Sequence, residues 1–425
     1  MSRRSKYLPA LNSCFLNSIQ DEYIKNRNRW HSHYKPEQFN IFSPQCEVYC
    51  KESLLSAGHE PYKKEIVQYP CLQNRASDTL LVGDSGGFQI ATNKLNIDWN
   101  NQKNVDAVRL GILRYLEKNC DIAMTLDVPT FTIGHPEFKF QTFDQCMSQT
   151  LENMEFWMAN RNPDSKLRLL NVLQGRNEAE VEEWYGKVKH YDTHGWSFSS
   201  ANSDCVYYMI RTALMLAKDG ELNSHKNWIH VLGRTMPAVS VILTDLQNRI
   251  SNLVGTDIQI SYDSSSFVQS AITATLLDHT MSSELKARTA KVDMSYEAVK
   301  DQKISLNDYT GAKTKLGSAI MLDEMYIWHE KEHKWYWDVP TYSQVMVYNY
   351  EVTTMLMDDA HTMYDADHLN GTLLKVKHEI LPNVFSKGTI DEMIAELAKY
   401  KGLLVNNILK YNEPVVLADH GLFDW

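Results

Sequence analysis

An α/β fold, a TIM-like (β/α)8 barrel with an N-terminal extension and a C-terminal α/β subdomain, is predicted by three features of the sequence. Short apolar runs alternate with amphipathic stretches, which is typical of βα units around a parallel sheet. The runs end near residues 84, 127, 174, 200, 233 and 263, so successive ends are 43, 47, 26, 33 and 30 residues apart, close to the roughly 30 residues of a barrel unit with insertions. Polar residues stand at these ends. An open doubly wound sheet would also fit the alternation.

Six apolar runs are predicted to be strands of the barrel. Residues 39–42 (Phe-Asn-Ile-Phe) are the candidate first strand, and no eighth strand is evident in 280–300. The six runs are 80–82, 122–126, 169–173, 196–198, 229–232 and 258–262.

Amphipathic helices are expected after these runs. Val105, Val108, Ile112 and Leu116 fall on one helical face, and Asn104 before them is a plausible N-cap. Two further stretches repeat in the same way, and the second has a proline suited to a first helical turn. Their apolar positions are Met147, Leu151, Met154 and Met158, and Val239, Ile242, Leu246 and Ile250 after Pro237.

Three parts of the chain are distinguished by composition. Residues 1–36 form a basic and aromatic extension, 37–300 the barrel, and 301–425 a C-terminal subdomain. The last part contains a tryptophan-rich segment, and residues 389–392 (Thr-Ile-Asp-Glu) form a capping box ahead of a helical region over 393–409.

The charge balance restricts the partners. The 425 residues carry a formal charge of −10, which excludes coating of nucleic acid through bulk positive charge, so a polyanion must be met by a local patch. The candidate patch has basic residues interleaved with aromatic ones, and a solvated basic face explains it equally well. Its residues are Lys25, Arg27, Arg29, Trp30, His31, His33, Tyr34 and Lys35.

Membrane and metal sites are not expected. No apolar run is long enough to cross a bilayer and no secretory signal is recognisable, so the cytoplasm is the expected location. The seven cysteines are odd in number, without a CxxC pair, and all precede residue 206. Neither a disulfide framework nor a zinc ribbon is indicated, and no cofactor is expected.

Polar residues at the predicted strand ends are the candidate site. In Asp84-Ser85-Gly86-Gly87-Phe88-Gln89, two glycines would let the backbone approach a planar ligand while Phe88 lies on its face. Taken alone, this segment is equally an ordinary turn.

Three other strand ends carry an acid or an amide. Asp127 and Gln174 could read the donor and acceptor edge of guanine, or could simply be strand-end caps. Asp263 precedes a serine run, so it could be only the N-cap of the next helix.

Together and in this order, these segments resemble the tRNA-guanine transglycosylase superfamily over about residues 80–275. The segment 84–89 is similar to the family's most specific motif, and 172–175 (Val-Leu-Gln-Gly) to its base-reading glutamine segment. Residues 195–200 and 231–234 occupy the places of two glycine-rich strand ends, the second including Gly233. Tyr262-Asp263-Ser264 falls where the family has its nucleophile.

The resemblance implies a role for each residue. Asp263 would be the nucleophile and Asp84 the general acid/base, in a reaction that passes through a glycosyl-aspartate. The base would be read by Asp127 and Gln174 and enclosed between two side chains, and backbone amides would meet its carbonyl. The enclosing side chains are Phe88 and Leu232, and the amides are those near Ser200 and Ala201.

Two departures from the family affect the substrate. The transfer RNA enzymes have a zinc site of three cysteines and a histidine after the nucleophile, whereas this chain has no cysteine after Cys205. The resemblance is therefore greatest to the DNA-modifying (DpdA-type) transglycosylases of phages and bacteria. These exchange guanine in duplex DNA, which must be extruded, for a 7-deazaguanine such as 7-cyano-7-deazaguanine. Asp204 and Cys205 stand where the bacterial enzymes have a glutamate.

Other functions stay open at this point. The same chemistry on transfer RNA is the first alternative. His329-Glu330-Lys331-Glu332-His333 fits the HExxH pattern of zinc peptidases, with Glu351 as a conceivable third ligand, but its flanks favour two strands and a charged turn. A non-catalytic barrel that binds nucleic acid is the third, although such chains lose the acidic pair that Asp84 and Asp263 form here.

Overall fold

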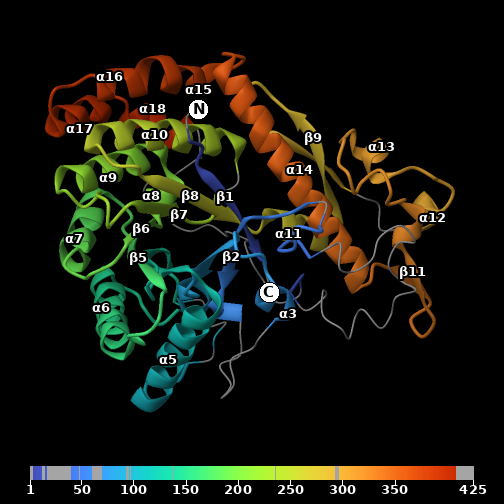
Figure 1. Ribbon diagram of the computed structural model, residues 1–425, viewed down its shortest axis with the longest axis horizontal. Coiled ribbons are helices and arrows are strands. Elements are labelled where there is room, and N and C mark those ends of the chain that lie inside the picture. The colour runs from blue at the N-terminus through green and yellow to red at the C-terminus, as the bar shows by residue number, and fades with distance from the viewer. Residues whose placement is uncertain are drawn as a thin grey trace.

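The computed structural model describes residues 3–11, 15–16, 40–46, 48–59, 69–91, 95, 97–136, 138–234, 236–291 and 296–407. Within these residues, eight parallel strands form a closed barrel, in which each strand pairs with the next and the eighth pairs with the first (Figure 1). Closure excludes the open doubly wound sheet. The strands are β1 (Lys6–Leu11), β2 (Glu52–Ser56), β3 (Leu80–Asp84), β4 (Ile122–Met124), β5 (Arg168–Leu173), β6 (Gly195–Phe198), β7 (Trp228–Val231) and β8 (Gln259–Ser264).

All six apolar runs predicted to be strands are strands, β3 to β8, but the prediction for the first strand is wrong. Residues 41–46 form turns, and the barrel begins with β1, inside the segment 1–36 that the sequence assigned to an extension. The run 258–262 is the eighth strand, so none is needed in 280–300. Two features concealed the first two strands: β1 contains Pro9, which lacks a donor for the ladder, and β2 has only two apolar residues.

Helices surround the barrel as the apolar patterns predict. α5 (Gln102–Asn119) buries Val105, Val108, Ile112 and Leu116, but its N-cap is Asn101, whose side chain accepts a hydrogen bond from the amide of Asn104. The predicted cap was therefore three residues too late. The other long helices of this ring are α6 (Phe143–Asn160), α7 (Glu178–Val188), α9 (Val206–Lys218) and α10 (Pro237–Val254).

Shorter elements connect these strands and helices or follow the barrel along the chain. They are η3 (Ala57–His59), α3 (Pro70–Gln73), α4 (Gly87–Ala91), η4 (Thr130–Thr132), α8 (Ala201–Asp204), α11 (Ser266–Ile272), the hairpin of β9 (Thr275–Met281) and β10 (Ala287–Lys291), α12 (Tyr296–Val299), α13 (Leu306–Thr310) and η5 (Asp323–Met325).

The C-terminal part packs onto the barrel. The long helix α14 (Val339–Asp365) crosses beside α10, α11 and β9, and is drawn in orange in Figure 1. The capping box predicted at 389–392 begins α17 (Ile390–Ala398), and the helical region is interrupted before α18 (Lys401–Asn407). The remaining elements are the hairpin of β11 (Ile327–His329) and β12 (Lys334–Tyr336), α15 (Gly371–Lys375), the π-helix η6 (Val376–Ile380) and α16 (Leu381–Phe385).

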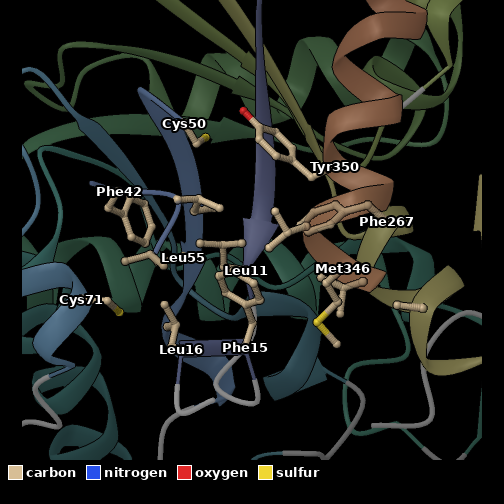
Figure 2. Close-up of a cluster of buried hydrophobic side chains, with 14 of the residues drawn as sticks. Leu11, Phe15, Leu16, Phe42, Cys50, Leu55, Cys71, Phe267, Met346 and Tyr350 are labelled. Atoms are coloured by element: carbon tan, nitrogen blue, oxygen red, sulfur yellow. The ribbon is translucent and has the colours of Figure 1, made fainter. Parts of the chain in front are cut away.

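Barrel and C-terminal side chains share continuous hydrophobic cores. Figure 2 shows one of them, where Tyr350 and Met346 of α14 face Phe267 of α11 and Leu11 of β1. The rings of Phe267 and Tyr350 are 6.0 Å apart. A separate cluster fills the barrel interior with Leu, Ile, Val and Met side chains and one Trp. Among the described helices, none combines the length and the apolar character needed to span a membrane.

Asn349 of α14 is expected to fix this helix to the β9 strand. Its Oδ1 accepts the amide hydrogen of Leu277 at 2.9 Å, and its Nδ2 donates to the carbonyls of Thr275 at 3.0 Å and Phe267 at 3.3 Å. Asn349→Leu would leave these buried groups without partners, so we expect a loss of about 2–4 kcal/mol in the free energy of unfolding, measured with urea. The exposed Thr362→Ala on the same helix should change it by less than about 0.5 kcal/mol. Equal stability of both variants would contradict the role of Asn349.

Candidate active site

The predicted site residues gather at one rim of the barrel. Because all eight strands are parallel, their C-terminal ends point the same way. Each residue lies at or directly after such an end. In order they are Asp84 (β3), Phe88 (α4), Asp127 (after β4), Gln174 (after β5), Ser200 and Ala201 (after β6), Leu232 and Gly233 (after β7) and Asp263 (β8).

The two glycines after β3, Gly86 and Gly87, allow close backbone contacts within the protein. Gly86 has a φ of +82°, and a Cβ there would lie 2.5 Å from the Cα of Gly58. A Cβ on Gly87 would lie 2.8 Å from Oδ1 of Asp127 and 2.7 Å from its carbonyl oxygen. The glycines therefore bring α4 directly against Asp127, whereas the sequence suggested that they admit a planar ligand. Asp84 itself accepts hydrogen bonds from Ser56 Oγ at 2.8 Å and the Gly86 amide at 3.2 Å.

Asp127 and Gln174 form a buried pair. Gln174 Nε2 donates to Asp127 Oδ2 at 2.6 Å and to Ser199 Oγ at 2.9 Å, while its Oε1 accepts from the Thr130 amide at 3.3 Å and from the Ser200 hydroxyl. Burial raises the pKa of Asp127 to about 7, and the charge of Asp84 acts in the same direction. A carboxyl group that gains or loses its proton near neutral pH therefore lies next to an amide at the rim.

Asp263 is held by one of its two oxygens. Its Oδ1 accepts the Gly233 amide hydrogen at 2.8 Å and lies 3.2 Å from Nε2 of His230. The helix that follows begins after Ser265, so the reading of Asp263 as an N-cap is wrong. Its side chain is largely buried, with 10 % of its surface exposed.

Behind Asp263, a chain of polar side chains runs into the barrel. His230 Nδ1 lies 2.8 Å from Ser261 Oγ, which also accepts a hydrogen bond from Trp228 Nε1 at 2.8 Å. Sequence reasoning missed His230. Its signal was strand parity: Ile229 and Val231 pack outward against the helices, so the residues between and before them point inward.

The aromatic wall of the rim contains a residue that was not predicted. Phe88 is half-buried and stacks on Phe131 of η4, with ring centroids 5.3 Å apart and planes at 30°. Phe131 follows Asp127 by four residues, as Phe88 follows Asp84, and this repeated spacing could have revealed it. Leu232 is half-buried against the barrel interior, and its pairing with Phe88 around a base stays a prediction.

The amide predicted at Ala201 is not available for a ligand. It donates to the carbonyl of Gly175 at 3.1 Å, so that part of the prediction is wrong. Ser200 has a φ of +50°, which is unusual for a residue with a side chain, and this conformation accompanies the bond from its hydroxyl to Gln174.

A cation lies close to Asp263. Arg234 pairs with Asp204, one of the two residues that stand at the place of the family's glutamate. Burial lowers the pKa of Arg234 to about 10, and the Asp263 carboxylate opposes this shift. Arg234 is therefore charged at neutral pH, and it forms an ion pair with the Asp204 carboxylate.

The zinc-peptidase pattern lacks the helix it needs. His329 ends β11, and a turn separates it from β12, as the flanking residues predicted. Glu351 instead accepts the backbone amides of Lys315 at 2.7 Å and Leu316 at 3.4 Å. Among the residues that the structure describes, no group of three or more His, Cys, Asp or Glu side chains could hold a metal ion.

The predicted nucleic-acid patch is not covered by the described residues. Its residues lie outside the described part of the chain, as does the whole segment 17–39. They are Lys25, Arg27, Arg29, Trp30 and Lys35, with His31, His33 and Tyr34.

Comparison with known proteins assigns no family. No protein-family model matches the chain, and no curated protein matches it. The function therefore has to be inferred from the chemistry of the rim.

The raised pKa of Asp127 predicts how stability depends on pH. The folded state holds this proton up to about pH 7, whereas the unfolded chain releases it near pH 3.9, so folding costs more as the pH rises between these values. Relative to Asp127→Asn, the wild type should lose roughly 2–3 kcal/mol of unfolding free energy between pH 5 and pH 8, measured with urea. The exposed Asp257→Asn, on the opposite end of the barrel, should show no such trend. A constant difference between wild type and Asp127→Asn would mean that Asp127 is ionised already at pH 5.

Gly87→Ala is expected to disturb Asp127 directly. The added methyl group would overlap Oδ1 and the backbone oxygen of Asp127, which must move, at a cost of about 1–3 kcal/mol in unfolding free energy. Gly186→Ala in α7 is the matched control, because a Cβ there meets nothing within 4 Å and the helix gains from alanine. Urea unfolding of both variants tests this, and a neutral Gly87→Ala would show that the contact between α4 and Asp127 is loose.

Proposed function

We propose that the protein is a base-exchanging transglycosylase that replaces guanine in DNA by a 7-deazaguanine. The observation that carries the proposal is that three carboxyl groups lie at one rim in different environments. Asp84 and Asp127 lie close enough for the charge of Asp84 to raise the pKa of Asp127, while Asp263 lies on β8 with its Oδ1 held by His230 and Gly233. A reaction with a nucleophile, an acid/base and a base-reading carboxylate needs this set.

The buried pair is suited to the edge of guanine. Guanine presents N–H donors beside a carbonyl acceptor, which a carboxylate and an amide N–H complement. Gln174 now donates to Asp127 and Ser199, so an entering base would replace the Asp127–Gln174 bond by bonds to each partner. Asp127 must be ionised for both of its oxygens to accept N–H groups of guanine, so with a pKa of about 7 we expect base binding to depend on pH near neutrality. Phe88, backed by Phe131, offers a face for stacking.

The chemistry consists of two displacements at the anomeric carbon. The Asp263 carboxylate forms a bond to C1′ as the bond from C1′ to N9 of guanine breaks. Asp127 releases its proton when it binds the base, Asp84 takes up that proton, and Asp84 in this acid form protonates the leaving N9. The incoming 7-deazaguanine then gives its N9 proton to Asp84 and attacks C1′, which releases Asp263. Two inversions retain the configuration of the sugar.

DNA is favoured over transfer RNA by the sequence after the nucleophile. The zinc site of the transfer RNA enzymes requires cysteines there, and the chain has none after Cys205. A guanine in duplex DNA must leave the stack to reach a barrel rim, at a cost of a few kcal/mol that stacking on Phe88 and contacts to Asp127 and Gln174 would offset.

Incubation with labelled guanine and either duplex DNA or transfer RNA tests the proposal. We expect label in DNA and a covalent adduct between protein and DNA. Asp263→Asn should reduce exchange by roughly 10³-fold or more, because an amide does not attack the sugar, and Asp84→Asn should slow proton transfer. Asp257→Asn, the same change at an exposed residue just before β8 begins, should exchange at the wild-type rate.

Each other outcome has a defined meaning. Label in transfer RNA alone would support base exchange but with transfer RNA, not DNA, as the substrate. Incorporation into neither polymer, or full activity of Asp263→Asn, would overturn the proposal.

A further inference from the structure

We infer that Trp228, Ser261 and His230 form a buried relay that positions Asp263, leaving Oδ2 as the attacking oxygen. The inference rests on the proposed function, in which Asp263 is the nucleophile. His230 does not contact the sugar or the base in this scheme, so it is a positioning residue.

The proton positions follow from what each group is able to donate. The Trp228 indole has only a donor, so it takes an acceptor site of the Ser261 hydroxyl, at 2.8 Å. The hydroxyl proton is then directed to His230 Nδ1, also at 2.8 Å. Nδ1 thus accepts, and the ring proton is on Nε2, which donates to Asp263 Oδ1 at 3.2 Å.

A doubly protonated, charged His230 would leave the hydrogen bonds among these three side chains less well satisfied. With protons on both ring nitrogens, the Ser261 oxygen would accept from both Trp228 and His230, and its own proton would need another acceptor. Among the described residues, the hydroxyl contacts only these two side chains, and His230 and Ser261 are fully buried among the barrel strands. When His230 is neutral and protonated on Nε2, each polar side-chain group of the relay has a hydrogen-bond partner.

The relay fixes which oxygen reacts. Oδ1 of Asp263 receives two donors, the Nε2–H of His230 and the backbone amide of Gly233 at 2.8 Å. A carboxylate held in this way cannot rotate freely, so Oδ2 keeps one orientation, and an aligned nucleophile loses less entropy on reaching the transition state.

The same two donors act differently in the two displacements. In the first, negative charge leaves the carboxylate as the bond to C1′ forms, so the donors help by orientation alone. In the second, charge returns to the carboxylate, and the donors at Oδ1 stabilise it as a leaving group. Loss of His230 should therefore slow the release of Asp263 more than its attack.

The test compares His230→Leu, which has no donor, with His230→Gln, whose amide places an N–H near the position of Nε2. For His230→Leu we expect exchange to fall roughly 10²–10³-fold, with the KM for the incoming base within about threefold of wild type. The fraction of protein trapped as a covalent adduct with DNA during turnover should rise. His230→Gln should recover exchange to within about tenfold of wild type, and the exposed His225→Gln before β7 is the matched control.

Ser261→Ala provides a second route if His230→Leu does not fold. It removes the hydroxyl that sets the tautomer while the imidazole remains, so we expect exchange to fall about tenfold at unchanged KM. Wild-type exchange by either His230→Leu or Ser261→Ala would overturn the relay. Equal losses in the Leu and Gln variants, with a raised KM and less adduct, would show a purely structural role and would also overturn it. If wild-type protein forms no covalent adduct, the proposed function fails instead.

Discussion

The parallel pairing of β1 with β8 is the constraint on which the site depends, because it closes the barrel. An open sheet would spread the strand ends over a long edge, whereas closure brings all eight around one opening. Leu8 of β1 lies beside Asp263 in register, and on the other side β1 pairs with β2. The strand nearest the N-terminus therefore holds the most C-terminal carboxylate of the rim in place. Its interior face contributes Leu8 to the apolar cluster that keeps water out of the barrel.

Burial of polar groups at the rim is made possible by their mutual hydrogen bonds. Gln174 uses both its amide hydrogens and its oxygen within the protein, and Asp263 has two donors on one oxygen. A buried polar group without a partner costs about 1–3 kcal/mol, so these contacts stabilise the fold and the site together. Asp127 is the exception in energetic terms, because its burial opposes ionisation and only Gln174 among its side-chain partners acts in the other direction. As a result, the pKa of Asp127 is about 7, at the place where the base is proposed to bind.

Periodicity and strand ends predicted much of this arrangement from the sequence. The apolar runs gave β3 to β8 because parallel strands covered on both faces are continuously hydrophobic. β1 was not predicted because Pro9 interrupts its apolar pattern. A proline can nevertheless stand in a strand where no backbone N–H is needed for pairing. The acids and the amide of the rim, Asp84, Asp127, Gln174 and Asp263, were predictable as polar residues at the ends of their runs. The hydrogen bond of the Ala201 amide to Gly175 could not be predicted, because it depends on how two adjacent strand ends approach each other. The partnership of His230 with Asp263 likewise depends on the register between β7 and β8, which no single strand reveals.

The strand that carries Asp263 is also braced from outside. Alternation turns its neighbour Tyr262 outward, where its hydroxyl donates to Ser240 Oγ of α10 at 2.7 Å. Ser240 in turn contacts Nε2 of His361, on α14, at 3.1 Å. Burial lowers the pKa of His361 to about 4, so at neutral pH this ring is uncharged and accepts the serine proton. A hydrogen-bonded chain therefore joins the C-terminal helix to β8.

Two chains of the same kind thus meet on consecutive residues of β8. On the inner side an indole, a hydroxyl and an imidazole end at Asp263, and on the outer side an imidazole, a hydroxyl and a phenol end at Tyr262. Positioning of reacting groups requires an accuracy of about half an ångström, which a single contact on a strand end does not provide. Support from both faces restricts β8 more than either contact alone, and it links α14, which packs on α10 and α11, to the strand that carries Asp263.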